Sequence, residues 1–551
     1  MSGLVREWAP AVKRPDHPSS MRPPTVTLGG ARKTQDQAAP LFLSGTDSTP
    51  GTRAAWVWFL IPVLLHLVLQ AVHAYLDRAP DFDEAIYMDL ARSIVRTGKI
   101  IASNYPPTTF LIHPPLFYYL VSVSFALLGP GLEAGRLVST LMSVGNLAFV
   151  FYFLRRARGD RWAAAGTLLV AVNPAFLYYG HSVYMEMTVA FWITAALWAY
   201  SRAGVGESLR WERWAGVFLG LACVTKYYAA ILVAVMALAT WSRDARGSAG
   251  RIQRLTALLA PVAVAGALWV AWGLAMGGAR DFIGAQLSWG LPEPPGSIYS
   301  WRAVNNWMFI RELVGVVTPA FACLAALGLA VAARRLWRLR SLLQGSVAMV
   351  LVVFPVAYLL FLLTFRNKDV KYIVPVIPAL GILIGLAPTV AWVKRLPAWS
   401  RWAGTLVLAA LASPLLPLYD PVTHQRHDNL WVFGIRRDPE YRRYCEAGVL
   451  VGRETNPGQV ILVQRKGPII GYYANRYYLD LWGLPLGEAI ADLKKADLVV
   501  LDRNTEYMPL EDQESFRQAV KKDFSQFGSL PESGTPVLEL FRRTRPDTLS
   551  R

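Results

Sequence analysis

Long runs of apolar residues, separated by short clusters of arginine and lysine, dominate the chain. Several runs reach the roughly 20 residues that an α-helix needs to cross about 30 Å of hydrocarbon. The clearest are residues 56–75, 255–276, 313–333, 346–365 and 372–393. Only 17% of the residues are charged, whereas a water-soluble chain usually carries about 25%. The sequence therefore predicts an α-helical polytopic membrane protein.

Weaker apolar runs raise the predicted number of transmembrane helices to about eleven. The assigned spans are 55–76, 136–154, 162–179, 186–201, 214–226, 228–241, 255–276, 313–333, 346–365, 372–393 and 402–418. Residues 54–418 are thus the predicted membrane domain. Residues 1–53 are rich in Pro, Ser, Thr and basic residues and have no apolar period, so we expect a disordered cytoplasmic tail.

The composition becomes that of a soluble protein in residues 419–551. Apolar runs at 460–463 and 498–501 read as buried strands, with a helix over 484–495 between them. This region is predicted to be a small α/β domain.

Lysine and arginine concentrate in every second connection between the predicted spans, as in 155–161, 243–254 and 334–340. The positive-inside rule places these connections in the cytoplasm. The long first loop, 77–135, and the C-terminal domain then lie on the non-cytoplasmic face, which has no nucleotide pool. The net charge of +18 lies mostly in loops beside the spans, so we expect no nucleic-acid partner.

Three carboxylates, Asp81, Asp83 and Glu84, follow the first span directly. Neighbouring carboxylates can raise one another's pKa, which suits a general base. The structural alternative is that Asp83 caps a helix over 84–97 that stops at Gly98. Both can hold together, because a capping loop fixes where its carboxylate points.

The first loop ends in His113, two prolines and a group of aromatic residues. The aromatic residues suit a membrane interface, and residues 116–128 are too few to span comfortably, so we expect an interfacial helix there. His113 is a candidate phosphate ligand, although a lone loop histidine is more often a hydrogen-bonded structural residue.

Two ionisable residues lie beside apolar stretches, at the ends of predicted spans: Glu186 and Lys226. Such residues are costly in a membrane and suggest function, the alternative being a side chain that snorkels to water. A lysine there has a phosphate as its natural partner. The further cationic candidates on the same face are Arg302, Arg366, Lys368 and Lys371.

No phosphate-binding glycine loop, dinucleotide fingerprint, HExxH motif or nucleophile elbow occurs in the chain. His181 and Glu186 are compatible with a divalent metal, but no ligand spacing establishes one. We therefore name no certain cofactor.

Taken in order, these residues resemble the GT-C class of membrane glycosyltransferases. The resemblance rests on Asp-Glu-Ala at 83–85, His-Pro-Pro-Leu at 113–116, Glu186, Thr225-Lys226, and the prolines after Lys371-Tyr372. The class includes protein O-mannosyltransferases, the aminoarabinose transferases of lipid A and related lipopolysaccharide glycosyltransferases. The aminoarabinose transferases have an arginine where this chain has Ile86, and Lys-Pro-Pro where it has His-Pro-Pro, which argues against their specific sugar.

The resemblance implies an inverting transferase that moves a sugar from a polyprenyl-phosphate carrier to a hydroxyl of a lipid, glycan or protein. It implies Asp83 as the base, with Glu84 and Glu186 as further acidic site residues. Tyr87 and Tyr372 are the aromatic candidates for acceptor contact. Cysteine and Arg/Ala usage fit the inner membrane of a bacterium, with the site on its outer face. A transporter of lipid-linked sugars is one alternative, but it predicts internal repeats and charges at mid-membrane, which the sequence does not show. A flippase of lipid-linked sugars is the nearer alternative, and the sequence leaves it open.

Overall fold

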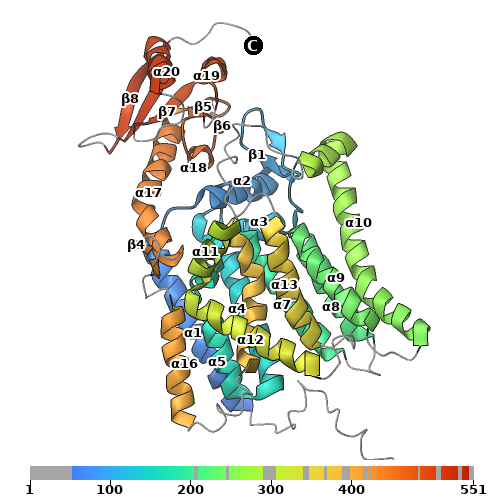
Figure 1. Cartoon of the computed structure of the whole chain (residues 1–551). Helices are drawn as coiled ribbons and strands as arrows, with labels where there is room; N and C mark the ends of the chain where they lie inside the picture. The colour runs from blue at the N-terminus through green and yellow to red at the C-terminus, as the bar shows by residue number, and fades with distance from the viewer. Residues whose placement is uncertain are drawn as a thin grey trace, which may run out of the picture. The chain divides into compact units, whose positions relative to one another are not determined.

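The computed structural model describes residues 52–203, 209–242, 247–288, 306–338, 347–364, 369–387, 398–413, 418–420, 425–427, 430–481, 484–503, 510–531 and 537–544. The predicted tail over 1–53 therefore lies almost wholly outside the described residues. The described chain is mostly helical, as Figure 1 shows.

Helices make up the part of the chain that the sequence assigns to the membrane. In chain order they are α1 Thr52–Leu76, α4 Leu132–Arg158, α5 Asp160–Ala171, α6 Pro174–Gly180, α7 Met185–Arg202, α8 Arg210–Cys223, η1 Tyr227–Ala229, α9 Ala230–Ser242, α10 Gly247–Ser288, α11 Asn306–Val317, α12 Pro319–Arg338, α13 Val347–Thr364, η3 Val370–Val376, α14 Ile377–Leu386 and α16 Ala398–Ala412. Among them α1, α4, α10 and α13 are each long and apolar enough to cross a membrane. Counting two bent pairs as one span each gives up to six among the described residues.

The predicted spans over 162–179 and 313–333 each correspond to a pair of helices with a bend between them. The chain bends by 72° between α5 and α6 and by 98° between α11 and α12. Pro174 begins α6 behind an Asn173 cap, and Pro319 begins α12 behind Thr318, whose φ is 72°. Proline has no N–H to continue a helix, so each bend falls where a proline interrupts the backbone ladder.

Small residues set how closely the helices approach. The ideal Cβ position at Gly216 of α8 lies 2.1 Å from the carbonyl oxygen of Leu258 of α10. At Gly220, one turn later, it lies 3.1 Å from the carbonyl oxygen of Pro261. Close backbone contact of this kind is how helices associate in a membrane, where apolar side chains gain little by leaving lipid.

The first loop contains α2 Phe82–Thr97, the strands β1 Ile101–Ala102 and β2 Thr108–Thr109, and α3 Leu116–Leu128, where the sequence predicts a helix. The cap of α2 is Asp81, not Asp83 as predicted. The Asp81 side chain accepts from the backbone N–H of Phe82 and of Glu84, and the Glu84 side chain accepts from Asp81 N–H. The reciprocal pair between Asp81 and Glu84 is a capping box. Gly98 ends the helix in the left-handed region, φ 71°, as predicted.

The C-terminal region begins with the hairpin of β3 Leu418–Asp420 and β4 Gln425–His427 and the long helix α17 Leu430–Glu454. A five-stranded sheet follows in the order β6-β5-β7-β9-β8. Its elements are β5 Val460–Val463, α18 Gly467–Ala474, β6 Tyr477–Asp480, α19 Leu486–Leu493, β7 Leu498–Asp502, α20 Leu510–Asp523, β8 Phe524–Leu530 and β9 Leu538–Arg543. Strands β5 and β7 coincide with the predicted strands at 460–463 and 498–501, and α19 lies within the predicted helix 484–495. Strands β6, β5 and β7 are parallel, whereas β9 is antiparallel to both β7 and β8.

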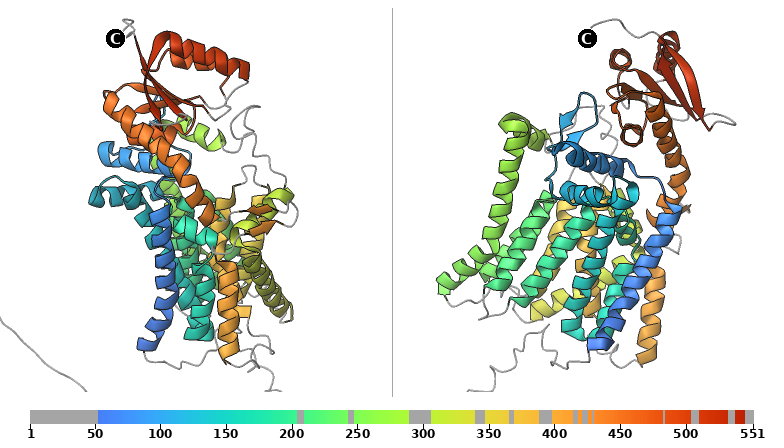
Figure 2. Two further views of the ribbon diagram at one scale, coloured as in Figure 1. Left: turned by 90° about the vertical axis from the view of Figure 1, so that its left-hand side faces the viewer. Right: turned by 180° about the vertical axis from the view of Figure 1, so that it is seen from behind.

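The first loop and the C-terminal sheet lie at the same end of the helices, as Figures 1 and 2 show. They are also hydrogen-bonded: Tyr105 N–H donates to Tyr478 O at 2.8 Å, and Tyr478 N–H donates to Ser103 O at 3.0 Å. Since Tyr478 belongs to the edge strand β6, the first loop pairs with this edge of the sheet. The carboxylates of α2 are therefore held between the helices and the C-terminal region.

Candidate functional site

Asp83 lies in the first turn of α2 and reaches across to η3. Its Oδ2 is 2.5 Å from Nζ of Lys371, which also lies 3.0 Å from Oδ2 of Asp369. The Asp83 side chain is 27% exposed, against 9% for Lys371. The lysine is thus enclosed between two carboxylates, while Asp83 keeps access to solvent.

Glu186, in the first turn of α7, pairs with Lys226. Its Oε1 is 2.5 Å from Nζ of Lys226, and both side chains are almost completely buried. The second oxygen, Oε2, has no hydrogen-bond partner among the described residues. A buried carboxylate with one open acceptor position can take a further donor.

Tyr372 joins the two ion pairs. Nζ of Lys226 lies 4.7 Å from the centre of its ring, and Nζ of Lys371 lies 5.8 Å from the same centre. The ring faces of Tyr228 and Tyr184 also approach Lys226 and Lys371, at 5.3 Å and 5.5 Å. Aromatic faces offset part of the cost of burying a cation. Asp83, Lys371, Lys226 and Glu186, separated by up to 288 positions in sequence, therefore form one continuous charged cluster around Tyr372.

His113 is buried beside this cluster, with its ring 6.4 Å from that of Tyr227 and 6.0 Å from that of Phe110. Burial, together with the positive charges of Lys226 and Lys371, lowers the pKa of His113 well below its usual value. At neutral pH the imidazole is therefore uncharged. It can donate one hydrogen bond to an anion but adds no positive charge.

Glu84 faces away from the cluster into a separate buried network. Both of its oxygens lie 3.2 Å from the guanidinium of Arg136, and Oε1 also accepts from Val183 N–H at 2.8 Å. Tyr87, one helical turn on, packs in an aromatic group with Phe117, Tyr118 and Tyr184 at 5.8–5.9 Å. Both residues thus hold α2 in place.

His181 belongs to the same network as Glu84. Its Nε2 lies 3.4 Å from Nη1 of Arg136, and its ring packs at 5.6 Å against His73. Glu186, the other predicted metal candidate, is held by Lys226 instead. The described residues contain no group of three or more His, Cys, Asp or Glu side chains placed to hold a metal ion.

Arg437 of α17 is a residue that the sequence analysis missed. It lies 2.9 Å from Asp81, 3.4 Å from Asp77 and 3.8 Å from Glu84. Burial would raise the pKa of Asp81, but the charges of Arg437 and Lys466 outweigh it and lower this pKa to about 2. No local pattern predicts this contact, because Arg437 is one of many arginines and lies about 350 positions from its partners.

Arg302, Arg366 and Lys368 lie outside the described residues. Of the predicted cations, Lys226 and Lys371 are thus the two whose positions are described, and both belong to the cluster. A carboxylate with solvent access, two buried lysines and a neutral histidine can accept a proton from a hydroxyl group and neutralise a phosphate.

The sequence is similar to that of membrane glycosyltransferases. A family model described as dolichyl-phosphate-mannose-protein mannosyltransferase matches residues 112–272. The undecaprenyl phosphate-α-4-amino-4-deoxy-L-arabinose arabinosyl transferase of Pectobacterium carotovorum is 25% identical over 368 residues, which is 64% of each chain. The protein of the same name from Edwardsiella ictaluri is 28% identical over 166 residues, 29% of this chain and 30% of that one. The chain thus matches less than two thirds of the length of these relatives.

The fold is similar to that of two solved glycosyltransferases. ArnT from Cupriavidus metallidurans in the apo state superposes with a TM-score of 0.61 at 17% identity, over 89% of this chain and 98% of that one. The oligosaccharyltransferase of Archaeoglobus fulgidus in the apo form gives a TM-score of 0.57 at 14% identity, over 82% and 70%. The predicted resemblance to the GT-C class is therefore confirmed at the level of the fold, which this chain shares with ArnT and the archaeal oligosaccharyltransferase.

Proposed function

We propose that this chain is an inverting glycosyltransferase that moves a sugar from a polyprenyl-phosphate carrier to an acceptor hydroxyl on the non-cytoplasmic face of the membrane. The observation that carries the proposal is the pair of linked ion pairs, Asp83–Lys371 and Glu186–Lys226, in a fold shared with ArnT. The names of the relatives, which describe sugar transfer from a lipid phosphate, support it.

Asp83 is the general base in this mechanism. It takes the proton of the acceptor hydroxyl as the hydroxyl oxygen attacks the anomeric carbon of the donor. The bond from that carbon to the phosphate oxygen breaks, and the carrier leaves as a polyprenyl phosphate. Because phosphate is already a good leaving group, one base is enough and no general acid is needed.

Lys226 and Lys371 hold the departing phosphate, with one hydrogen bond from His113. In the structure Lys226 is paired with Glu186, and Lys371 is paired with both Asp83 and Asp369. The donor phosphate therefore competes with these carboxylates for the two lysines. Freeing Asp83 from Lys371 when the donor binds would leave it ready to accept a proton. Arg302, Arg366 and Lys368 remain proposed phosphate ligands.

The remaining site residues act on the geometry of the cluster. Glu186 positions Lys226 and offers Oε2 to a further donor, such as an acceptor hydroxyl. Glu84 fixes the first turn of α2, and Tyr87 packs that helix on its neighbours, so neither contacts the reacting groups in this proposal. The ring of Tyr372 packs against the ammonium groups of both lysines.

The proposed topology has about eleven spans within residues 54–418. Residues 1–53 are assigned to the cytoplasm and the domain 419–551 to the other face of a bacterial inner membrane. The helix α2, which carries Asp83, lies at the same end of the helices as the C-terminal sheet (Figure 1), in agreement with placing both on one face.

The proposal is tested by measuring sugar release from radiolabelled polyprenyl-phosphate sugars by the purified protein in detergent. Asp83→Asn should lower turnover at least about a hundredfold, the low end for the loss of a general base. Asp281→Asn is the matched control, since this aspartate is exposed on α10. Equal turnover in Asp83→Asn and the wild type would remove Asp83 as the base.

A further inference from the structure

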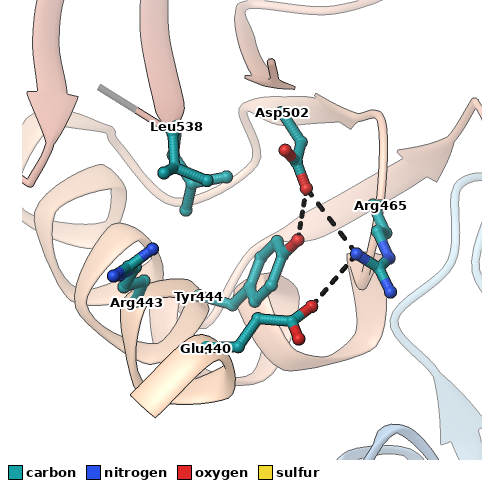
Figure 3. A pocket seen from close by; sticks show the side chains of 7 residues that line it. Glu440, Arg443, Tyr444, Arg465, Asp502 and Leu538 are labelled. Atoms are coloured by element: carbon teal, nitrogen blue, oxygen red, sulfur yellow. Dashed lines mark hydrogen bonds and ion pairs between the residues drawn. The ribbon is translucent and has the colours of Figure 1, made fainter. Parts of the chain in front are cut away.

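A cavity of about 300 Å³ lies in the C-terminal region, away from the charged cluster (Figure 3). Its lining consists of Glu440, Arg443, Tyr444, Arg465, Asp502, Val537 and Leu538. Nothing in the proposed mechanism uses it.

The cavity lies where two adjacent parallel strands end. Arg465 follows β5 by two residues, and Asp502 is the last residue of β7. The helix after β5, α18, packs with α17 on one face of the sheet, whereas α20, after β7, packs with α19 on the other. Open α/β sheets bind ligands at such positions, outside the carboxyl ends of strands whose connections leave to opposite faces.

The polar groups of the cavity are arranged around Asp502. Tyr444 donates its hydroxyl to Asp502 at 2.5 Å, and Arg465 lies 3.0 Å from Glu440. The distance from Arg465 to Asp502 is 3.9 Å, too long for a direct hydrogen bond, so a hydroxyl group between them could bond to both. The side chain of Arg443, on the other side of Tyr444 in Figure 3, makes no hydrogen bond or ion pair to another described residue.

This lining fits a neutral, hydroxyl-rich ligand. Two arginines donate and two carboxylates accept, so the formal charges cancel and a hydroxyl can meet either kind of partner. The carboxylates oppose an anion. The volume is at the small end of the range of roughly 300–1,000 Å³ for ligand pockets, which suits a single sugar ring better than a nucleotide. Val537, Leu538 and the ring of Tyr444 provide apolar surface for the C–H groups of such a ring.

The cavity shares its supporting segments with the turn that carries Asp83. Lys466, next to Arg465, has the rare left-handed φ of 59°; its Nζ donates to Tyr441 at 2.6 Å and lies 5.7 Å from the ring centre of Phe82. On α17, Glu440 of the cavity lies about one turn from Arg437, which pairs with Asp81. A ligand in the cavity is thus fixed relative to the start of α2.

We propose that this cavity binds one neutral sugar residue of the acceptor, so that the acceptor of the transferase is a glycan or glycolipid. That the bound sugar belongs to the acceptor rests on the proposed function. Binding of a sugar by the cavity can be tested without measuring turnover.

The test is a saturation-transfer NMR titration of the full-length protein in a detergent without a sugar headgroup. The probes are D-glucose, D-galactose, D-mannose and N-acetyl-D-glucosamine. The cavity variants are Arg443→Gln and Glu440→Gln, both at side chains with solvent access, so folding should survive. Arg453→Gln, exposed on the same helix, is the matched control. Asp83→Asn is titrated as well.

We expect at least one sugar to bind, with affinity at least about tenfold weaker in both cavity variants, the effect of losing one hydrogen bond to a charged group. Affinity should be unchanged in Arg453→Gln and Asp83→Asn. This result supports the cavity even if no donor is turned over, in which case the transferase alone is in question. Absence of binding by all four sugars, or equal binding in both cavity variants, overturns the inference even where turnover is measured.

Discussion

The surroundings of the buried pair Glu186–Lys226 determine how much stability is lost when either residue is replaced. Removing one partner of a buried ion pair leaves a lone charge and typically costs about 3–5 kcal/mol. The two single variants should differ, however. In Glu186→Gln, Lys226 keeps the ring faces of Tyr228 and Tyr372 at 5.3 and 4.7 Å. In Lys226→Met, Glu186 loses its cation, and its Oε2 already has no partner among the described residues.

Cation–π contacts contribute about 1–2 kcal/mol at buried sites. Lys226→Met should therefore be less stable than Glu186→Gln by about that amount. The double variant Glu186→Gln/Lys226→Met buries no charge, so its loss should be smaller than the sum of the two single losses.

The assay is unfolding of the purified proteins in one detergent, with and without polyprenyl phosphate. Under the proposed function, the phosphate supplies the anion that Lys226 lacks in Glu186→Gln, so it should stabilise this variant more than the wild type. Glu212→Gln is the control, because Glu212 is also buried and paired with an arginine, Arg254 of α10, but lies outside the charged cluster. Additive single losses, or a Glu186→Gln variant less stable than Lys226→Met, would refute the reasoning.

Three further outcomes follow from other contacts. Asp81→Asn keeps the helix cap but removes the carboxylate of Asp81, whose pKa is lowered from 3.8 to about 2. The variant should therefore be less stable than the wild type by about 2 kcal/mol at pH 6. That difference should vanish as the pH falls through 4 towards 2 in acid-unfolding curves, and a constant difference would contradict it. Gly216→Ala should lower stability by about 1–3 kcal/mol because its Cβ meets a backbone oxygen of α10, whereas Gly266→Ala, with open space at Cβ, should not. His113→Gln should reduce turnover without altering the pH–rate profile between pH 6 and 8, because the pKa of His113 already lies well below its usual value; loss of a limb near pH 6 would show that His113 titrates.

Much of the fold could be predicted because its signals are local. The apolar runs gave α1, α4, α10 and α13, and the short apolar stretch after the two prolines gave α3. The bends within the predicted spans 162–179 and 313–333 were not predicted, because hydropathy is blind to backbone geometry and a proline interrupts the helix inside each run. Asp83 was wrongly assigned as the cap because any of three neighbouring acidic or capping residues fits the start of the same helix.

The candidate site was predictable only in part. Glu186 and Lys226 could be proposed because charged residues beside apolar runs are costly. Lys371 was proposed from a cluster of cations on one face and Tyr372 from the family resemblance, and the structure brings all four together with Asp83. The sequence could not predict that Glu84 pairs with Arg136 and lies outside the charged cluster, because Arg136 looks like an ordinary charged residue at the end of a span. Side-chain partners hundreds of residues apart leave no periodic trace.

The contacts of Arg437 determine the order in which parts of this protein can assemble during synthesis. Asp77, Asp81 and Glu84 are made early, but one of the cations that neutralise them belongs to α17, some 350 residues later. During synthesis the first loop must therefore wait, with this acidic group incompletely paired, until nearly all membrane helices have been inserted. In the proposed topology, the turn that carries Asp83 is completed only after the C-terminal segment has followed the first loop across the bilayer.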